Sequence, residues 1–445
     1  MDHQLLLVTA QARSVRSGVG TYARMLIEGY AERGLPVTVA TWTQEMDPEA
    51  LPGIDWLDLG SRPRTDPTQD SFWTLGKRIV KAFGRIETRP THVHFLDARA
   101  AHAFVRSPHR RGLRVLGTLH DDYAARCPSH PFAYFGQAMD PIRRWAFYRW
   151  LARVEKRCFA RFDVLLANSR ATARSLSKAY GIPESRMAIS PLTVGTTPQG
   201  LRPRDLDGSP ALLFSGGNFY RKGLDILVRA MALLDDSLPD VELHVAGQDK
   251  AQGRIRALAM QLGVDERVHF HGRVEPSRMA ALFASADMFV MPSRTEALGL
   301  VYLEAFRAGL PVVAAAEGGV VEIVKDHKTG LLVPPCDEQA LAGAIHSLWG
   351  DADLQRRLIQ GGHALLTQRS PDYLVEQTLL AYGEDWITLD DNADQLETSS
   401  LSIDSEPELS EVPSLFGTDQ PESPVINSMP MSNRDPMASG ENIRS

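Results

Sequence analysis

Cysteine is scarce in this sequence, and long hydrophobic runs are missing. Only 3 of the 445 residues are cysteine, and Cys127, Cys158 and Cys336 are scattered along the chain. They fit neither a disulfide framework nor a zinc site. No stretch reaches the roughly 18 uncharged apolar residues that a membrane span needs. The start leads into a strand-like segment, 5–8, instead of a signal peptide, so we expect a cytoplasmic protein.

The length and the charge distribution indicate several parts. With 445 residues, 43% of them hydrophobic, the chain is too long for one ordinary domain and too apolar to be disordered throughout. Residues 1–200 carry 28 Lys and Arg against 18 Asp and Glu, residues 201–387 carry 18 against 25, and residues 388–445 carry 2 against 12. The basic first part is compatible with peripheral contact to an anionic membrane or with an acidic substrate, although a solvated surface has the same composition. We expect no nucleic-acid partner.

The last part of the chain is rich in Ser, Asp, Glu and Pro from about residue 390. Such a segment cannot bury enough apolar surface to offset the entropy of ordering. We therefore predict a disordered acidic tail over 390–445, without a catalytic role.

Short apolar, β-rich runs alternate with longer helix-like segments along the rest of the chain. The runs are 4–9, 36–42, 91–96, 113–119 and 163–167, then 211–215, 241–246, 267–271, 287–291 and 311–315. This alternation predicts βαβ units in two parallel, doubly wound α/β sheets. Because residues 190–210 are rich in Pro, Gly and Thr, the connection between the two series is expected there.

A glycine-rich turn follows the first expected strand. Gly18 and Gly20 lie just before a helix-like run, 22–33. Glycines allow a ligand to approach the backbone closely, and the amides at a helix start favour negative charge. A dinucleotide-binding fingerprint would need a third glycine where Ala23 stands. An ordinary strand-to-helix turn is an equal alternative.

A polar cluster follows the expected strand 113–119, where His120 is succeeded by Asp121 and Asp122. Ligands of open α/β sheets gather beyond the carboxyl ends of the strands, so this cluster is placed for function. A loop histidine bonded to the backbone is the alternative. A Mg²⁺ site is disfavoured, because no third ligand stands at a useful spacing.

A second glycine-rich segment ends the first strand of the second half. It contains Gly217 and Asn218, followed by the adjacent cations Arg221 and Lys222. A guanidinium can bind a diphosphate through two hydrogen bonds, and an ammonium adds a mobile charge. Solvated Arg-Lys pairs are common, but the neighbouring glycines favour a phosphate site.

The segment 292–311 is the most informative part of the sequence. Glu296 lies in a loop after a strand, Gly299 marks a helix start, and Glu304 falls in the second helical turn. Carboxylates at this spacing can reach opposite ends of an elongated ligand, with the helix amides facing a phosphate between them. Two solvated helix glutamates are the alternative, which would leave the flanking small and apolar residues unexplained.

Together these motifs resemble glycosyltransferase family 4. Glu296 and Glu304, with seven residues between them, give the E-x7-E pattern of retaining glycosyltransferases. The glycine-rich turn, the histidine loop and the cation pair stand in the order of that family. The likeness continues through 308–313, 317–319, Glu322 and 328–333. It covers about residues 4–387.

The resemblance implies a GT-B fold, in which two Rossmann-like domains face a central cleft. The expected domains are an acceptor-binding domain at 1–200 and a nucleotide-sugar-binding domain at 201–371. A C-terminal helix at about 372–387 would complete the first domain.

The resemblance also implies roles for single residues. His120 would lie beside the transferred sugar, Glu296 would bind the sugar hydroxyls, and Lys222 with Arg221 would bind the donor diphosphate. The other expected donor-binding residues are Gly18, Gly20, Gly217, Asn218, Gly299, Leu300, Val301 and Glu304. We expect no metal and no other cofactor, because the cations would stabilise the departing nucleoside diphosphate.

The sequence departs from the family pattern at four places. Ser17 replaces a glycine, Asn218 replaces an arginine, Leu298 replaces an aromatic residue, and the Pro-Asn-Gly segment before the connection is missing. Arg221 would take over part of the charge of the missing arginine.

The expected activity is retaining transfer of a sugar from a UDP- or GDP-sugar to a glycan or lipid-linked acceptor, in the synthesis of a surface polysaccharide or glycoconjugate. The alternatives are a GT-B nucleotide-sugar epimerase, a NAD-dependent oxidoreductase with an incomplete fingerprint, and a catalytically silent carbohydrate-binding or scaffold protein. Arginines and aromatic residues alternate at helical spacing over 143–153, as in a helix at a membrane interface. Packing of Trp145, Tyr148 and Ala152 on a sheet is the favoured alternative.

Overall fold

The structure is a computed structural model. It describes residues 4–13, 18–47, 51, 53–63, 70–126, 141–195, 206–234, 236–249, 252–383 and 386, which all belong to one compact unit, Met1–Ala393. The predicted acidic tail at 390–445 lies outside the described residues, as do Cys127 and part of the predicted connection. Cys158 is a buried free thiol, and Cys336 is an exposed one.

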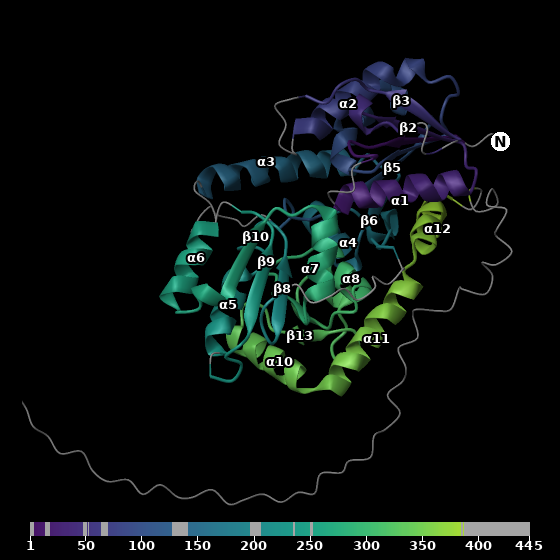
Figure 1. Cartoon of the computed structure of the whole chain (residues 1–445). Coiled ribbons are helices and arrows are strands. Elements are labelled where there is room, and N and C mark those ends of the chain that lie inside the picture. The colour runs from purple at the N-terminus through teal and green to yellow at the C-terminus, as the bar shows by residue number, and fades with distance from the viewer. Residues whose placement is uncertain are drawn as a thin grey trace, which may run out of the picture. The chain divides into compact units, whose positions relative to one another are not determined.

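The first half of the chain folds around a seven-stranded parallel sheet with the order β3-β2-β1-β4-β5-β6-β7. Strands β2, β3, β5 and β6 of this sheet are labelled in Figure 1. The strands are Leu5–Val8 (β1), Val37–Thr41 (β2), Ile54–Asp58 (β3), His92–Phe95 (β4), Arg114–Leu119 (β5), Val164–Ala167 (β6) and Met187–Ile189 (β7). Leu5 pairs with Val37 on one side and with His92 on the other. All four residues of β1 are buried, because a central parallel strand is covered on both faces.

The helices of the first half are α1 (Gly18–Glu32), α2 (Asp70–Ala82), α3 (Pro141–Phe159) and α4 (Arg170–Tyr180). In α1, Tyr22, Leu26 and Tyr30 recur every four residues and form a buried stripe. Helix α4 is capped by Ser169, the residue before it, whose side chain accepts a hydrogen bond from the backbone N–H of Thr172. No helix among the described residues is both long and apolar enough to cross a membrane.

The second half folds around a six-stranded parallel sheet with the order β10-β9-β8-β11-β12-β13. Its strands are Ala211–Ser215 (β8), Glu242–Ala246 (β9), Val268–Gly272 (β10), Met288–Met291 (β11), Val312–Ala315 (β12) and Leu331–Val333 (β13). Its helices are α5 (Leu224–Leu233), α6 (Gln252–Gln261), α7 (Pro276–Ser285), α8 (Leu300–Arg307), α9 (Val320–Ile323), α10 (Glu338–Gly350) and α11 (Ala352–Gln368). The predicted fold class of two doubly wound parallel sheets is confirmed. Each sheet has a switch point, at β1/β4 and at β8/β11, where ligands of such folds bind.

The last described helix, α12 (Pro371–Tyr382), follows the second half in sequence but packs against α1 of the first half. The hydroxyl groups of Tyr382 and Tyr30 lie 2.9 Å apart, and Tyr382 also contacts Nδ1 of His94 at 2.7 Å. Trp386 is fully buried beyond the end of the helix. These contacts tie the end of the described chain to the first sheet.

Candidate active site

A pocket of about 400 Å³ lies at the carboxyl ends of both sheets, a size suited to a small-molecule ligand. Eight of the twelve predicted site residues line it: Gly18, His120, Lys222, Glu296, Gly299, Leu300, Val301 and Glu304. The pocket therefore brings together residues that are separated by up to about 290 positions in the sequence.

The charged centre of the pocket joins the two loops that follow β8 and β11. The ammonium of Lys222 is bonded to Oε2 of Glu296, and the guanidinium of Arg221 lies 3.5 Å from the same oxygen. Lys222 is 8% exposed and Glu296 is 6% exposed. Arg221 also donates a hydrogen bond of 3.1 Å to the backbone carbonyl of Thr295. Two cations share one carboxylate, so this centre carries one net positive charge that suits an anionic ligand.

Burial opposes the charged forms of both Lys222 and Glu296. Burial alone would raise the pKa of Glu296, but Lys222 and Arg221 outweigh it and hold the pKa of Glu296 below its ordinary value. Burial lowers the pKa of Lys222, and the neighbouring Glu296 offsets this only in part. An anionic ligand beside Lys222 would stabilise the buried ammonium further.

A close backbone approach and an ion pair hold the two loops together. Gly223 precedes α5 with a φ of 76°, and a Cβ there would lie 2.0 Å from the carbonyl oxygen of Pro292. Arg294 binds both carboxylate oxygens of Asp225, at 2.6 and 2.8 Å, and its guanidinium lies 4.0 Å above the ring of Tyr220. The cation pair is therefore held against the Glu296 loop from both sides.

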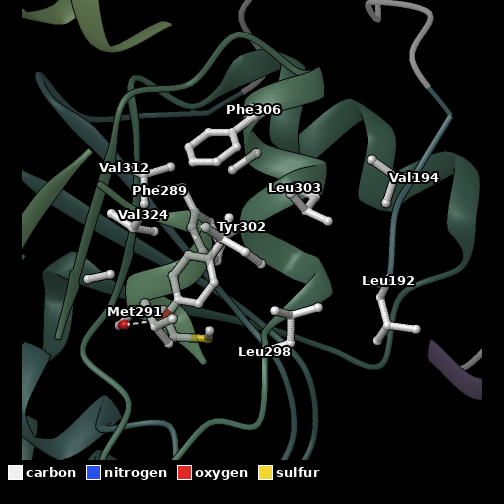
Figure 2. Close-up of a cluster of buried hydrophobic side chains, with 14 of the residues drawn as sticks. Leu192, Val194, Phe289, Met291, Leu298, Tyr302, Leu303, Phe306, Val312 and Val324 are labelled. Atoms are coloured by element: carbon white, nitrogen blue, oxygen red, sulfur yellow. Dashed lines mark hydrogen bonds between the residues drawn. The ribbon is translucent and has the colours of Figure 1, made fainter. Parts of the chain in front are cut away.

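The start of α8 is anchored in the core and points into the pocket. Gly299 precedes it with a φ of 95°, and a Cβ there would lie 2.6 Å from the ring of Tyr302. The hydroxyl of Tyr302 donates a 2.8 Å hydrogen bond to the carbonyl of Met291 (Figure 2). Leu300 and Val301 line the pocket. Because the first amides of a helix have no partner within it, they can bind a phosphate.

Glu304 and Gly18 line the pocket next to the start of α8. Burial raises the pKa of Glu304, although Arg307 and Lys222 oppose this shift. A Cβ on Gly18 would lie only 2.9 Å from Cδ1 of Leu300, so glycine allows α1 to approach α8 across the pocket. Both halves of the chain thus meet at the amino terminus of α8.

Four predicted residues do not line the pocket: Gly20, Gly217, Asn218 and Arg221. Gly20 is buried within α1. Asn218 has a φ of 55° and accepts a 3.3 Å hydrogen bond from the backbone N–H of Arg221. It therefore shapes the turn that presents the two cations. At this loop the lining residues are Ser215 and Gly216.

His120 lines the pocket and is also bonded to the backbone. Its Nε2 donates to the carbonyl oxygen of Leu96 at 2.5 Å, and Asn168 donates a 2.9 Å hydrogen bond to the carbonyl of His120. Burial lowers the pKa of His120, although nearby carboxylates oppose this shift. The imidazole is therefore neutral at pH 7. Since Nε2 carries the proton, Nδ1 is left as an acceptor.

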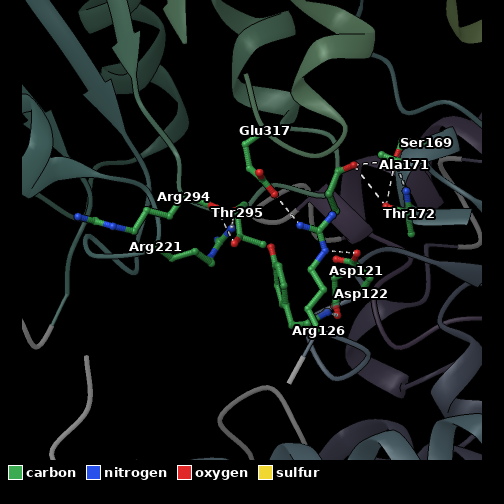
Figure 3. Close-up of polar contacts among 12 residues, drawn as sticks. Asp121, Asp122, Arg126, Ser169, Ala171, Thr172, Arg221, Arg294, Thr295 and Glu317 are labelled. Carbon is green, nitrogen blue, oxygen red and sulfur yellow. Dashed lines mark hydrogen bonds and ion pairs between the residues drawn. The ribbon is translucent and has the colours of Figure 1, made fainter. Parts of the chain in front are cut away.

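The two aspartates after His120 are each paired with an arginine. Asp121 lies 2.6 Å from Arg99, and Asp122 lies 2.5 Å from Arg126. Arg126 also reaches Glu317 of the second half, at 2.6 Å (Figure 3). Among the described residues, no three His, Cys, Asp or Glu side chains are grouped so that they could hold a metal ion.

Sequence reasoning missed Tyr123 and Asn168, which both line the pocket. The guanidinium of Arg221 lies 4.9 Å above the ring of Tyr123, in a cation–π contact between the two halves. Both residues closely follow strands of the first sheet, and that position is the signal that could have found them. Neither belongs to a recognisable spacing pattern.

Comparison with known proteins identifies the family. The model described as Glycosyltransferase Family 4 matches residues 16–197, and the model described as Glycosyl transferases group 1 matches residues 203–364. A D-inositol 3-phosphate glycosyltransferase of Arthrobacter sp. strain FB24 is 30% identical over 353 residues, which are 75% of this chain and 82% of that protein. The chain belongs to glycosyltransferase family 4. It is therefore an enzyme of the hexosyltransferase type.

Two further comparisons define how far the similarity reaches. A D-inositol 3-phosphate glycosyltransferase of Xylanimonas cellulosilytica is 36% identical over 226 residues, which are 47% of this chain and 54% of that protein. The chain thus spans only about half the length of this relative. Sucrose-phosphate synthase of Thermosynechococcus elongatus has a TM-score of 0.68 at 24% identity, over 85% of this chain and 98% of that one. This likeness shows the GT-B fold.

Proposed function

We propose that the chain is a retaining glycosyltransferase that moves a sugar from a UDP- or GDP-sugar to a hydroxyl group of a glycan or lipid-linked acceptor. The proposed setting is the synthesis of a surface polysaccharide or glycoconjugate. One observation carries the proposal: the buried Lys222–Glu296 pair and the amino terminus of α8 face the same small pocket. Cations and helix amides suit a diphosphate, and a carboxylate suits the hydroxyl groups of an attached sugar.

In the proposed mechanism, the protein stabilises the departing nucleoside diphosphate. Lys222, Arg221 and the α8 amides bind the developing negative charge, which is the largest expected catalytic contribution. The bond from the anomeric carbon to the phosphate oxygen breaks, and that oxygen keeps the electron pair. The acceptor oxygen bonds to the anomeric carbon on the same face, so its configuration is retained. The proton of the acceptor passes to the departing phosphate oxygen.

The remaining pocket residues orient the donor in this proposal. Glu296, held ionised by its two cations, accepts hydrogen bonds from the sugar hydroxyls. Glu304 binds the nucleotide ribose, and Nδ1 of His120 accepts a hydrogen bond from the transferred sugar. Since Lys222 and Arg221 supply the charge that Mg²⁺ would otherwise supply, we propose that no metal is required.

A panel of nucleotide sugars tests the proposed donor. The matching UDP- or GDP-sugar should raise the melting temperature, because a ligand at 100 times its Kd stabilises a fold by about 2.7 kcal/mol. The same donor should be hydrolysed slowly without acceptor and at an unchanged rate in excess EDTA. Activity that is lost in EDTA and restored by Mg²⁺ would overturn metal independence. Donor binding with neither hydrolysis nor transfer would indicate a catalytically silent protein.

We also propose that α3 contacts an anionic membrane, which would place the enzyme peripherally at the inner membrane face. Ile142 and Trp150 on this helix are 63% and 48% exposed. The exposed cations of the same helix include Arg143, Arg149 and Arg153. Trp145, Tyr148 and Ala152 are half-buried, so one face of α3 packs inward while exposed apolar and cationic residues remain available to lipid.

Vesicle flotation tests the membrane contact. The chain should float with vesicles that contain anionic phospholipid and not with purely zwitterionic vesicles. The double variant I142A/W150A should bind anionic vesicles about 5-fold less, since about 1 kcal/mol of apolar insertion is lost. Met260, which is 67% exposed on α6, offers the matched control, and M260A should float like the wild type. Equal flotation with both vesicle types, or none, would remove this proposal.

A further inference from the structure

The first turn of α4, in the first half of the chain, is bound by polar groups of the second half. The hydroxyl of Ser169 donates a 2.7 Å hydrogen bond to the backbone carbonyl of Ala297. The carboxylate of Glu322 accepts hydrogen bonds from the backbone N–H of Arg170, at 3.0 Å, and of Ala171, at 2.7 Å. Ser169, Ala171 and Thr172 of this turn are labelled in Figure 3.

These contacts complete the hydrogen bonding of the helix start. The first N–H groups of any helix lack partners within it. In α4 the N–H of Thr172 is bonded to the side chain of Ser169, and the N–H of Ala173 is bonded to the backbone carbonyl of Ser169. The two preceding N–H groups, those of Arg170 and Ala171, are bonded to Glu322. The full set therefore depends on a carboxylate of α9, in the second half of the chain.

The segment that carries Glu322 also contacts the loop around Glu296, which is called the donor loop below. The N–H of Gly319 donates a 3.0 Å hydrogen bond to the carbonyl of Glu296. A Cβ on Gly318 would lie 2.1 Å from the same carbonyl oxygen, so the two backbones are in direct contact. The carbonyl of the next residue, Ala297, is the one that Ser169 binds. One short segment thus connects Glu296 with α4.

We infer that Glu322 is a positioning residue: by capping α4 from the opposite half, it sets the distance between the donor loop around Glu296 and the acceptor side of the pocket. This inference rests on the proposed function, because it assumes that a donor bound at Glu296 meets an acceptor bound by the first half. Glu322 itself does not line the pocket. It acts through the backbone of α4 and of the donor loop.

A neighbouring carboxylate provides the matched control. Glu317 lies in the same segment and also reaches the first half, through Arg126. Arg126 is already paired with Asp122, and the side chains of Arg126 and Glu317 are 31% and 26% exposed. Partly exposed ion pairs contribute little. A carboxylate at a helix start binds backbone amides and the helix dipole, so Glu322 should matter more.

Hydrogen exchange and kinetics together test this inference. In E322A, the amides of Arg170 and Ala171 should exchange about 10-fold faster, measured by mass spectrometry on a peptide that spans residues 166–176. The kcat of transfer should fall about 10-fold, while the donor Kd stays within about twofold. E322Q, which keeps one carbonyl oxygen as acceptor, should be intermediate. E317A should match the wild type in all three measurements.

Three results would overturn the inference. The first is unchanged exchange of these amides in E322A, which would mean that the cap is absent. The second is faster exchange with an unchanged kcat. The third is a loss of donor affinity in E322A that is as large as the loss of kcat, which would indicate general damage to the second half. If the wild type transferred no sugar, the proposed function would fail, and the exchange result alone would still decide whether Glu322 caps α4.

Discussion

Replacing Lys222 with methionine should lower turnover at least about 10-fold. The departing diphosphate loses a charge-assisted contact, which contributes about 1.5 to 3 kcal/mol. Methionine keeps the length of the buried stem, so the pocket retains its shape. Arg221 still lies 3.5 Å from Glu296 and supplies part of the charge, so residual activity is expected. The measurement is kcat at saturating donor and acceptor.

The same replacement should destabilise the fold in a pH-dependent way. Removing one partner of a buried ion pair costs about 3 to 5 kcal/mol, and Arg221 moderates this loss. In the wild type the pKa of Glu296 is lowered, so its contribution to stability is present above about pH 4.5 and is lost as the pH falls through the folded pKa. In K222M burial should raise the pKa of Glu296, so stability falls as the pH rises. The difference in unfolding free energy should therefore widen from pH 5 to pH 8.

A double variant separates the effect on stability from the effect on catalysis. In K222M/E296Q the buried amide needs no counter-charge, so most of the lost stability and the pH dependence of the difference should disappear. Turnover should remain low, because the diphosphate still lacks its ammonium. Wild-type turnover in K222M would remove Lys222 from the diphosphate site. A pH-independent difference in stability would show that Glu296 is not a buried anion in the variant.

Nine of the ten strands that the sequence predicts lie in the interior of the two sheets, and the tenth, β10, lies at an edge. All ten predicted runs agree with observed strands within one residue at each end. The prediction misses β3, β7 and β13, and each of these lies at the edge of its sheet. These edge strands are short or partly exposed; in β3, Asp55 is exposed and Asp58 is half-buried. Strands β7 and β13 are apolar but only three residues long, and a run of that length does not distinguish a strand from another buried segment.

The features of the candidate site also fall into two groups: residues that the sequence predicts, and contacts between the two halves that it does not. Lys222 and Glu296 follow strong strands, so the rule that ligands bind at the carboxyl ends of strands locates both in advance. Contacts between the halves have no such signal. Tyr123 meets Arg221, and Ser169 meets Ala297, only because the two sheets face each other, and no spacing within one segment encodes that arrangement. The role inferred for Glu322 likewise depends on a contact between the two halves and could not be predicted from the sequence.

The glycine pair before α9 has the largest expected effect on the donor loop. A Cβ on Gly319 would lie 1.9 Å from the carbonyl oxygen of Ala297 and 3.0 Å from Cα of Leu298. Both are backbone atoms of the loop that carries Glu296, so they cannot move aside as a flexible side chain could. Gly319 has a φ of -77°, which alanine adopts without strain, so the whole effect of G319A is steric.

The expected result for G319A is a donor Kd at least about 10-fold higher, with an unfolding free energy lower by about 1 to 3 kcal/mol. Gly343 is the matched control, because it lies within α10 and a Cβ there meets nothing within 4 Å. G343A should raise stability by about 0.5 to 1 kcal/mol and leave the donor Kd unchanged, since glycine is unfavourable inside a helix. Calorimetric titration with the donor and denaturant unfolding measure both quantities. If G319A and G343A shifted the donor Kd and the unfolding free energy in the same direction, the close contact between Gly319 and the donor loop would be refuted.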